Sequence, residues 1–326
     1  MRKFGDIPVI DLGEINQISG SGINSIASQI RQAYRTIGFA YIVNHHVDPL
    51  LIKALFEKSI KFHSLPHEEK IKIQLNELHR GFIPLNTSTE RDSGLAVITK
   101  PNQSESFIMM READKSDPAV KSGDFLAGPN QWPDGLNGFQ ETLNTYFNEL
   151  TKLCHKICRI IALSLGTDKK TFASKFNPPT TFLRLIKYPP LTPNKSSEFF
   201  SSAPHTDFGC ITILAQDDTG GLQVKNSQGK WIDAPFMKDS FLMNVGDMLN
   251  RWSNGLLIST PHRVINRNGQ ERYSCAFFFE PNVNVEVSPM PSCISDLRPK
   301  QFEPIYYGEF LRDALEATYQ RHEVKN

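Results

Sequence analysis

An imidazole and a carboxylate stand two positions apart at the start of an apolar, β-branched run, which reads Ala203-Pro204-His205-Thr206-Asp207-Phe208-Gly209-Cys210-Ile211-Thr212-Ile213-Leu214. Side chains alternate between the two faces of a β-strand, so we expect His205 and Asp207 to project from the same face. Such a pair offers two ligands to a metal ion. Because short polar pairs at the start of a strand are also common in turns, a metal site here needs a third ligand.

The third candidate ligand is His262, which lies in a second strand-like run, Ser259-Thr260-Pro261-His262-Arg263-Val264-Ile265. Two histidines and one carboxylate on facing strands make a facial triad, which leaves adjacent positions of a non-haem Fe(II) open. An open face suits a metal that must bind a co-substrate and O₂ together. The sequence therefore predicts that His205, Asp207 and His262 are iron ligands and catalytic residues.

A guanidinium and a hydroxyl occur two positions apart in the next run, which extends from Arg272 to Phe279. In a strand, Arg272 and Ser274 share one face and together offer a forked donor and a hydroxyl to one carboxylate. Arg272 also has a structural interpretation, because most Arg side chains pair with carboxylates at the surface. The earlier run Tyr188-Pro189-Pro190, another candidate part of the site, could likewise be only a strand end with a stiff turn. The joint occurrence of these residues favours the functional interpretation.

The same residues carry a resemblance to a known family. His205-x-Asp207, His262, Arg272-x-Ser274 and Tyr188-Pro189-Pro190 are similar to the signature of the isopenicillin N synthase-like branch of the 2-oxoglutarate and Fe(II)-dependent dioxygenases. Comparable runs stand in the N-terminal third at Ile7–Leu12, Gly38–His45, Phe62–Lys70, Arg80–Phe82 and Glu105–Phe107. Such a series of ordered motifs over most of the chain is far more specific than the triad alone.

The resemblance implies an enzyme that uses Fe(II), O₂ and 2-oxoglutarate to oxidise a small organic molecule, with release of succinate and CO₂. Hydroxylation, desaturation and oxidative ring closure all remain open as outcomes, and ascorbate is an implied stimulant. In the family, an Arg-x-Ser pair and a Tyr meet the far carboxylate of 2-oxoglutarate, and these roles fall on Arg272, Ser274 and Tyr188. Ile186 departs from the pattern, because many relatives have Asn at this position.

Two alternatives remain open from the sequence. Isopenicillin N synthase and aminocyclopropane carboxylate oxidase keep a similar Arg-x-Ser pair but do not use 2-oxoglutarate. A jelly-roll binding protein that has lost catalysis would show a damaged ligand set, whereas all three candidate ligands are present.

Substrate contacts are expected from a polar loop that faces apolar strand ends. Residues 76–104 are rich in Asn, Ser, Thr and Pro, and a long loop of this kind is a candidate lid. The residues expected to contact substrate are Arg80, Phe82, Phe107, Met109 and Phe278. Phe278 is preferred over Phe279 because it shares the parity of Arg272 and Ser274. Asn244 is expected to serve packing.

We expect a single globular unit, residues 1–326, of mixed α+β class, with a double-stranded β-helix (jelly-roll) core and flanking helices. Residues 5–125 are the expected N-terminal dioxygenase region, 180–290 the Fe(II) and 2-oxoglutarate core, and 300–326 a C-terminal helix. From Thr181 onward, eight short runs separated by Gly, Pro and Asn suit a jelly roll. They are Phe182–Tyr188, Cys210–Gln216, Gly221–Val224, Trp231–Ala234, Phe241–Val245, His262–Asn266, Tyr273–Phe279 and Val283–Val287.

Composition argues against several classes of function. Lys and Arg number 36 and Asp and Glu 35, so a net charge of +1 offers no attraction for nucleic acid. No signal peptide or membrane span is evident, and five Cys at irregular spacing do not suit a disulfide framework. Cys154 and Cys158, which flank His155, are expected to be core residues of a helix rather than metal ligands. We expect a cytoplasmic monomer whose partner is a small-molecule substrate, with no nucleic acid or membrane partner.

Overall fold

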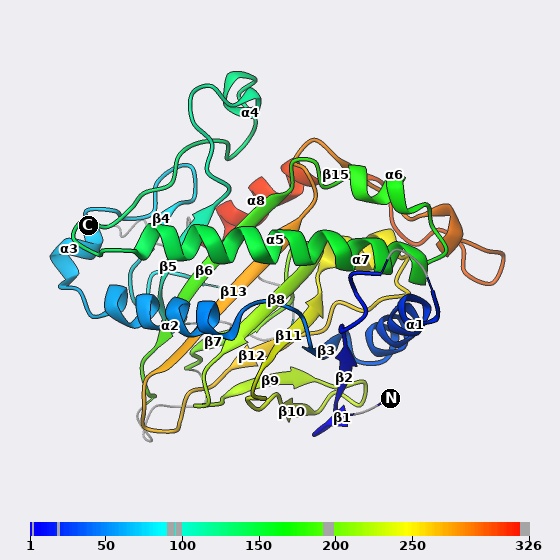
Figure 1. Cartoon of the computed structure of the whole chain (residues 1–326), viewed down its shortest axis with the longest axis horizontal. Coiled ribbons are helices and arrows are strands. Elements are labelled where there is room, and N and C mark those ends of the chain that lie inside the picture. Colours follow the sequence, from blue (N-terminus) through cyan, green and yellow to red (C-terminus); the bar gives the residue numbers. More distant parts are fainter. Residues whose placement is uncertain (2, 18–19, 90–94, 96–99, 192–198, 320–326) are drawn as a thin grey trace.

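Two main β-sheets, a separate two-stranded sheet and the helices around them build the molecule, shown as a computed structural model in Figure 1, which describes residues 1, 3–17, 20–89, 95, 100–191 and 199–319. The strands are β1 (Lys3–Phe4), β2 (Ile7–Asp11), β3 (Phe39–Val43), β4 (Gly81–Ile83), β5 (Glu105–Met110), β6 (Thr180–Tyr188), β7 (Ser202–His205), β8 (Ile211–Gln216), β9 (Leu222–Lys225), β10 (Trp231–Asp233), β11 (Ser240–Val245), β12 (His262–Val264), β13 (Arg272–Glu280), β14 (Glu286–Val287) and β15 (Ile305–Tyr306). The helices are α1 (Ser21–Thr36), α2 (Pro49–His63), α3 (His67–Ile71), α4 (Pro118–Lys121), α5 (Phe139–Ser164), α6 (Lys169–Ser174), α7 (Asp247–Trp252) and α8 (Tyr307–Tyr319).

The jelly-roll core takes four strands from each of the two sheets. The large sheet has the order β1-β2-β3-β11-β8-β13-β6-β5-β4, and the small sheet has the order β10-β9-β12-β7. Between β6 and β13 the chain passes repeatedly from one sheet to the other, while the N-terminal strands extend the large sheet at both edges. The predicted class, a mixed α+β fold with a jelly-roll core, is confirmed.

The eighth core strand differs from the prediction. Within the predicted run Val283–Val287, only Glu286–Val287 is a strand, and β14 pairs with β15 in a separate two-stranded sheet. The missing core strand is β7, which contains Pro204. Proline weakens the strand pattern because it cannot donate to the ladder, but it is tolerated at a sheet edge, which is where β7 lies.

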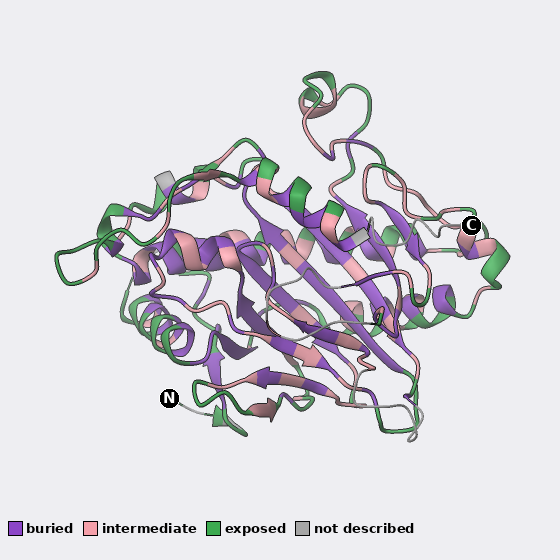
Figure 2. Cartoon of the chain, turned by 180° about the vertical axis from the view of Figure 1, so that it is seen from behind, coloured by how far each residue is buried: buried purple, intermediate pink, exposed green. Residues whose placement is uncertain are grey.

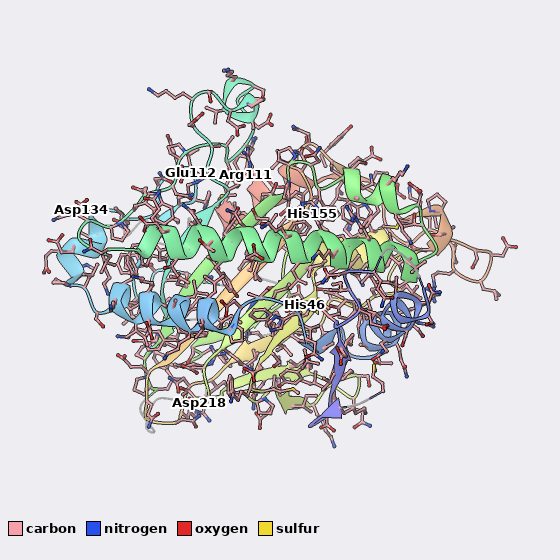
Figure 3. All side chains as sticks on the ribbon, viewed as in Figure 1. His46, Arg111, Glu112, Asp134, His155 and Asp218 are labelled. Carbon is pink, nitrogen blue, oxygen red and sulfur yellow. The ribbon has the colours of Figure 1, made fainter. Side chains whose placement is uncertain are left out.

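The two faces of the large sheet have different roles. Odd-numbered side chains of β13 pack under α5, where the rings of Phe277 and Phe147 lie 5.3 Å apart and those of Phe279 and His155 lie 5.0 Å apart. Figure 1 shows α5 lying across the large sheet, and Figure 3 labels His155 on this helix. Cys154 and Cys158 are buried on the same helix, as expected for core residues. Even-numbered side chains of β13 face the small sheet and line a cavity.

The opposite side of the sheet carries α8, which Figure 2 shows from behind. Leu311 and Leu315 of α8 line the cavity together with the even-numbered residues of β13. The last residues of the expected C-terminal helix, 320–326, lie outside the described residues, as do 90–94 and 96–99 of the candidate lid. In the described part of the chain, no helix is both long and apolar enough to cross a membrane.

Candidate active site

His205, Asp207 and His262 converge where the chain leaves the small sheet for the large one. His205 ends β7 and His262 begins β12, and the two residues are direct partners in the antiparallel register. Asp207 lies in the loop between β7 and β8, with Oδ1 3.9 Å from Nε2 of His205 and 3.7 Å from Nε2 of His262. Among the described residues, this is the one group of His, Cys, Asp or Glu side chains that could hold a metal ion.

The backbone that brings His205 and Asp207 together differs from the expected one. The two residues do not alternate along a single strand, because β7 ends at His205 and β8 begins only at Ile211. The loop turns Asp207 back toward the imidazoles instead. Its main chain is held by α7, since the amide of Asp247 donates to the carbonyl of Asp207 (2.8 Å).

Backbone carbonyls orient both imidazoles. Nδ1 of His205 lies 2.7 Å from the carbonyl oxygen of Ala203, and Nδ1 of His262 lies 3.2 Å from that of Thr260. A proton on Nδ1, donated to the carbonyl, makes Nε2 the nitrogen with the lone pair. In both rings, Nε2 is the atom that faces Asp207. Each ring therefore presents Nε2, beside the carboxylate of Asp207, as its available ligand atom.

Two polar side chains fix the carboxylate of Asp207. Its Oδ2 accepts hydrogen bonds from Thr212 Oγ1 (2.5 Å) and Asn244 Nδ2 (2.6 Å), which leaves Oδ1 toward the histidines. Burial alone would raise the pKa of Asp207, but the imidazoles of His262 and His205 and these two hydrogen bonds lower it below its ordinary value. Asn244 was expected to serve packing. The structure instead makes it an orienting residue for the carboxylate.

A second buried carboxyl group, that of Glu280, supports the loop from the end of β13. Its Oε2 accepts a hydrogen bond from the amide of Cys210 (2.7 Å). A Cβ atom on Gly209 would lie 1.2 Å from this oxygen, so any side chain at that position would displace the Glu280 carboxyl group. Burial raises the pKa of Glu280 well above its ordinary value, and the nearby charge of Asp207 acts in the same direction. Both effects favour the protonated form of this carboxyl group.

Arg272 and Ser274 line the same cavity as the triad. The Arg272 side chain is fully buried, with its guanidinium 4.9 Å from the ring centre of Tyr188 and Nη2 donating to Gln216 Oε1 (3.1 Å). In the described structure, Arg272 Nε and Nη1 and Ser274 Oγ have no hydrogen-bond partner.

Buried donors without acceptors are costly, at about 1 to 3 kcal/mol each and more for charged groups. A ligand carboxylate at Arg272 and Ser274 would satisfy these donors, so the site fits the far carboxylate of 2-oxoglutarate. Ile186, at the position of the family's Asn, lines the cavity and is the cross-strand partner of Ser274. The polar neighbour of the guanidinium is supplied by Gln216 instead.

The other residues that line the cavity include apolar side chains and several polar groups. Phe278 lines it, as expected from its parity with Arg272 and Ser274. Sequence analysis missed most of its other residues: Asn102, Ser104, Ile108, Phe182, Ser202, Phe208, Glu280, Tyr307, Leu311, Leu315 and Thr318. Strand parity could have indicated Glu280, which is two residues from Phe278. No pattern in the sequence indicates how α8 packs over the sheet.

The structure does not bring Arg80, Phe82, Phe107 or Met109 to this cavity. Arg80 is buried elsewhere, and its guanidinium donates to the carbonyls of Leu78 (2.8 Å) and Arg111 (3.3 Å). Phe82 and Phe107 pack in an aromatic cluster around Phe62.

On β5 it is the even-numbered Ile108 that lines the cavity, so Phe107 and Met109 have the opposite parity. Both faces of β5 are buried, and hydrophobicity therefore could not show which face meets the cavity.

Comparisons with known proteins agree with this geometry. Residues 179–281 match the family model described as 2OG-Fe(II) oxygenase superfamily, and residues 7–135 match the model described as non-haem dioxygenase in morphine synthesis N-terminal. A 2-oxoglutarate-Fe(II) type oxidoreductase of Emericella nidulans is 30% identical, covering 97% of this chain and 91% of the relative. A homoarginine-6-hydroxylase of Arabidopsis thaliana is 33% identical, covering 97% and 98%.

A solved structure shows the same fold. A full-length protein of Neurospora crassa, crystallised in complex with alpha-KG and thymine, matches with a TM-score of 0.83 and 30% identity, covering 95% of this chain and 96% of that chain. The chain therefore belongs to the 2-oxoglutarate and Fe(II)-dependent oxygenase superfamily. It is a dioxygenase that uses Fe(II) and 2-oxoglutarate to oxidise a small organic molecule, as the sequence predicted.

Proposed function

We propose that His205, Asp207 and His262 bind the iron, and that Arg272, Ser274 and Tyr188 bind the far carboxylate of 2-oxoglutarate. The observation that carries this assignment is the buried guanidinium of Arg272, whose Nε and Nη1 lack acceptors in the described structure and which lines the same cavity as the triad. When bound, Fe(II) would activate O₂ for the coupled oxidation of 2-oxoglutarate to succinate and CO₂ and of a C–H bond of the substrate.

The protein contributes orientation and shielding. Thr212 and Asn244 hold one oxygen of Asp207, so the other is presented to the metal in a fixed direction. Apolar side chains, including Phe39, Leu214 and Val264, line the cavity beside the polar groups. Their surfaces exclude water from a reaction that must spend its oxidant on the substrate alone.

We propose that the primary substrate occupies the part of the cavity that is lined by Phe278, Phe208 and the residues of α8. The apolar wall and the few polar groups there suit a small organic molecule. Relatives support this size class, since one is described as a homoarginine hydroxylase and another is solved with thymine.

The experiment that tests the assignment is an anaerobic titration followed by a turnover assay. Fe(II) and 2-oxoglutarate together should give a weak visible charge-transfer band in the wild type and in His46→Ala, whose exposed imidazole is labelled in Figure 3. His262→Ala should give no band. Substrate oxidation without succinate would instead indicate an enzyme of the isopenicillin N synthase kind.

We also propose that the enzyme is a cytoplasmic monomer without nucleic acid or membrane partners. Support comes from the near-balanced charge, +1 overall, and from five cysteines that are all buried and free. Light scattering after size-exclusion chromatography tests the oligomeric state, and a mass near twice 36.9 kDa would contradict it.

A further inference from the structure

Arg184 presents a guanidinium to the cavity from the middle of β6. In the register of the large sheet it stands opposite Ala276 of β13 and Ile108 of β5. Its even-numbered neighbours Phe182 and Ile186 line the same cavity, so this face of β6 is a wall of the active site. In Figure 1, β6 lies next to β13 in the large sheet.

The guanidinium is positioned but not neutralised. Nε donates to Ser106 Oγ (3.0 Å), which fixes the direction of the side chain. Among the described residues, Nη1 and Nη2 of Arg184 make no hydrogen bond, and Arg184 forms no ion pair. Arg111, by contrast, is paired with Asp117. Two forked donors therefore remain available at a partly buried position.

Arg184 is also separate from the proposed 2-oxoglutarate anchor. Tyr188, which stacks on Arg272, is two cavity-facing positions beyond Arg184 on β6. The backbones of Arg184 and Tyr188 are therefore about 13 Å apart along the strand. The two guanidinium groups are also held on opposite sides of the β13–β6 pair, because Nη2 of Arg272 donates to Gln216 of β8 whereas Nε of Arg184 donates to Ser106 of β5. The donors of Arg184 therefore need another acceptor.

Charge balance indicates what that acceptor carries. With iron and 2-oxoglutarate bound as proposed, the charges of Fe(II), Asp207, the dianion and Arg272 cancel. Burial lowers the pKa of His79 and raises that of Glu280, which disfavours a charge on either lining residue, and the Glu280 carboxyl group is already held by the amide of Cys210. Arg184 is a cavity-lining cation with no ion-pair partner among the described residues.

We propose that the primary substrate carries a carboxylate, which Arg184 binds with Nη1 and Nη2 while the apolar body of the substrate packs on Phe278, Phe208 and Leu315. This inference deepens the proposed function and depends on it. A fork of two N–H donors matches a carboxylate better than it matches a neutral carbonyl. Ser106 acts as a positioning residue for the fork.

The test uses matched carboxylates and primary amides as probes: phenylacetate and phenylacetamide, 3-phenylpropanoate and its amide, hexanoate and its amide, with thymine as a neutral carbonyl probe. Each is titrated into anaerobic enzyme carrying Fe(II) and 2-oxoglutarate, followed by the charge-transfer band and in parallel by thermal unfolding. We expect at least one carboxylate to bind about tenfold or more tightly than its amide.

The variants decide the role of the side chain. Arg184→Met should reduce the preference for carboxylate to less than about threefold, Arg184→Lys should retain part of it because a point charge replaces the fork, and Ser106→Ala should weaken it. Arg35→Met, at an exposed position of α1, is the matched control and should behave as wild type.

Several outcomes would overturn the proposal. They are amides or thymine binding as tightly as the carboxylates, no binding of any carboxylate, an unchanged preference in Arg184→Met, or a tenfold loss of 2-oxoglutarate affinity in that variant. Failure of the proposed function gives a different result, because the wild type with Fe(II) and 2-oxoglutarate then shows no charge-transfer band. In that case, thermal unfolding with the probes still tests whether Arg184 binds a carboxylate.

Discussion

His205 and His262 form a direct cross-strand pair of β7 and β12, with ring centroids 4.3 Å apart. β7 is an edge strand that ends at His205, so the position of this imidazole depends on its pairing with β12. One rung of the small sheet thus presents both imidazoles. The third proposed ligand, the carboxylate of Asp207, comes from the loop that joins β7 to β8.

Removing any one of the three proposed iron ligands should abolish turnover. His205→Ala, Asp207→Ala and His262→Ala each leave two ligands, which can no longer fix the open face of the metal. Succinate release and iron content after desalting measure the effect, with His46→Ala as control. Full activity of His262→Ala at saturating iron would disprove the assignment.

Loosening Asp207 should weaken iron binding without abolishing it. Asn244→Ala and Thr212→Val each remove one hydrogen bond to Oδ2, and loss of an orienting partner typically costs about 10- to 100-fold in metal affinity. Competition with a chelator measures the affinity. If Asn244 serves only packing, Asn244→Ala should lower the thermal stability and leave the iron affinity of the folded enzyme unchanged.

The co-substrate site should be separable from the iron site. Arg272→Ala should raise the KM for 2-oxoglutarate by roughly ten- to several-hundred-fold, because charge-assisted hydrogen bonds contribute about 1.5 to 3 kcal/mol each. Lysine should rescue in part, and Ser274→Ala should cost less, about 0.5 to 1.5 kcal/mol. Iron affinity should stay near that of the wild type. An unchanged KM in Arg272→Ala argues against the proposed anchor.

A buried ion pair away from the active site should make stability depend on pH. Glu105 Oε1 lies 3.0 Å from Nδ1 of His63 and accepts a hydrogen bond from Lys70 Nζ (2.9 Å). Burial alone would raise the pKa of Glu105, but His63 and Lys70 lower it to about 2. As the pH falls, Glu105 is therefore protonated in the unfolded chain before it is protonated in the folded protein. The stabilisation that the ionised Glu105 provides is complete above about pH 4.5 and is lost as the pH falls toward 2.

Glu105→Gln should therefore lower the free energy of unfolding at pH 7, by on the order of 1 to 3 kcal/mol after allowance for solvent screening. The difference from wild type should shrink as the pH falls from about 5 to about 3. Urea unfolding across this range measures it. Glu149→Gln, which removes an exposed ion pair with Lys152, is the control and should change the free energy of unfolding little at any pH. A difference between Glu105→Gln and wild type that does not depend on pH would contradict the prediction.

Strand alternation accounts for what the sequence could predict of the site. Arg272, Ser274 and Phe278 share one face of a long strand, and all three line the cavity. Alternation failed for His205 and Asp207, because a loop rather than a strand joins them. It also failed on β5, where both faces are buried and Ile108 rather than Phe107 meets the cavity.

Tertiary packing accounts for what the sequence could not predict. Asn244 reaches Asp207 because β11 pairs with β8, a contact that local pattern does not reveal. Leu311 reaches the cavity because α8 packs there, and only the fold brings it near residues far earlier in the chain. The division of the chain into an N-terminal region, a core and a C-terminal helix stays a prediction.

Leu311, Leu315 and Thr318 come from a helix that carries none of the proposed ligands of iron or 2-oxoglutarate. Mutations on this face of α8 can therefore accumulate in a lineage and change which molecules enter, while the oxidising machinery is inherited intact. A duplicated gene could acquire a new substrate in this way before losing any activity. In evolutionary terms, the helix is where the descendants of this enzyme are free to diverge.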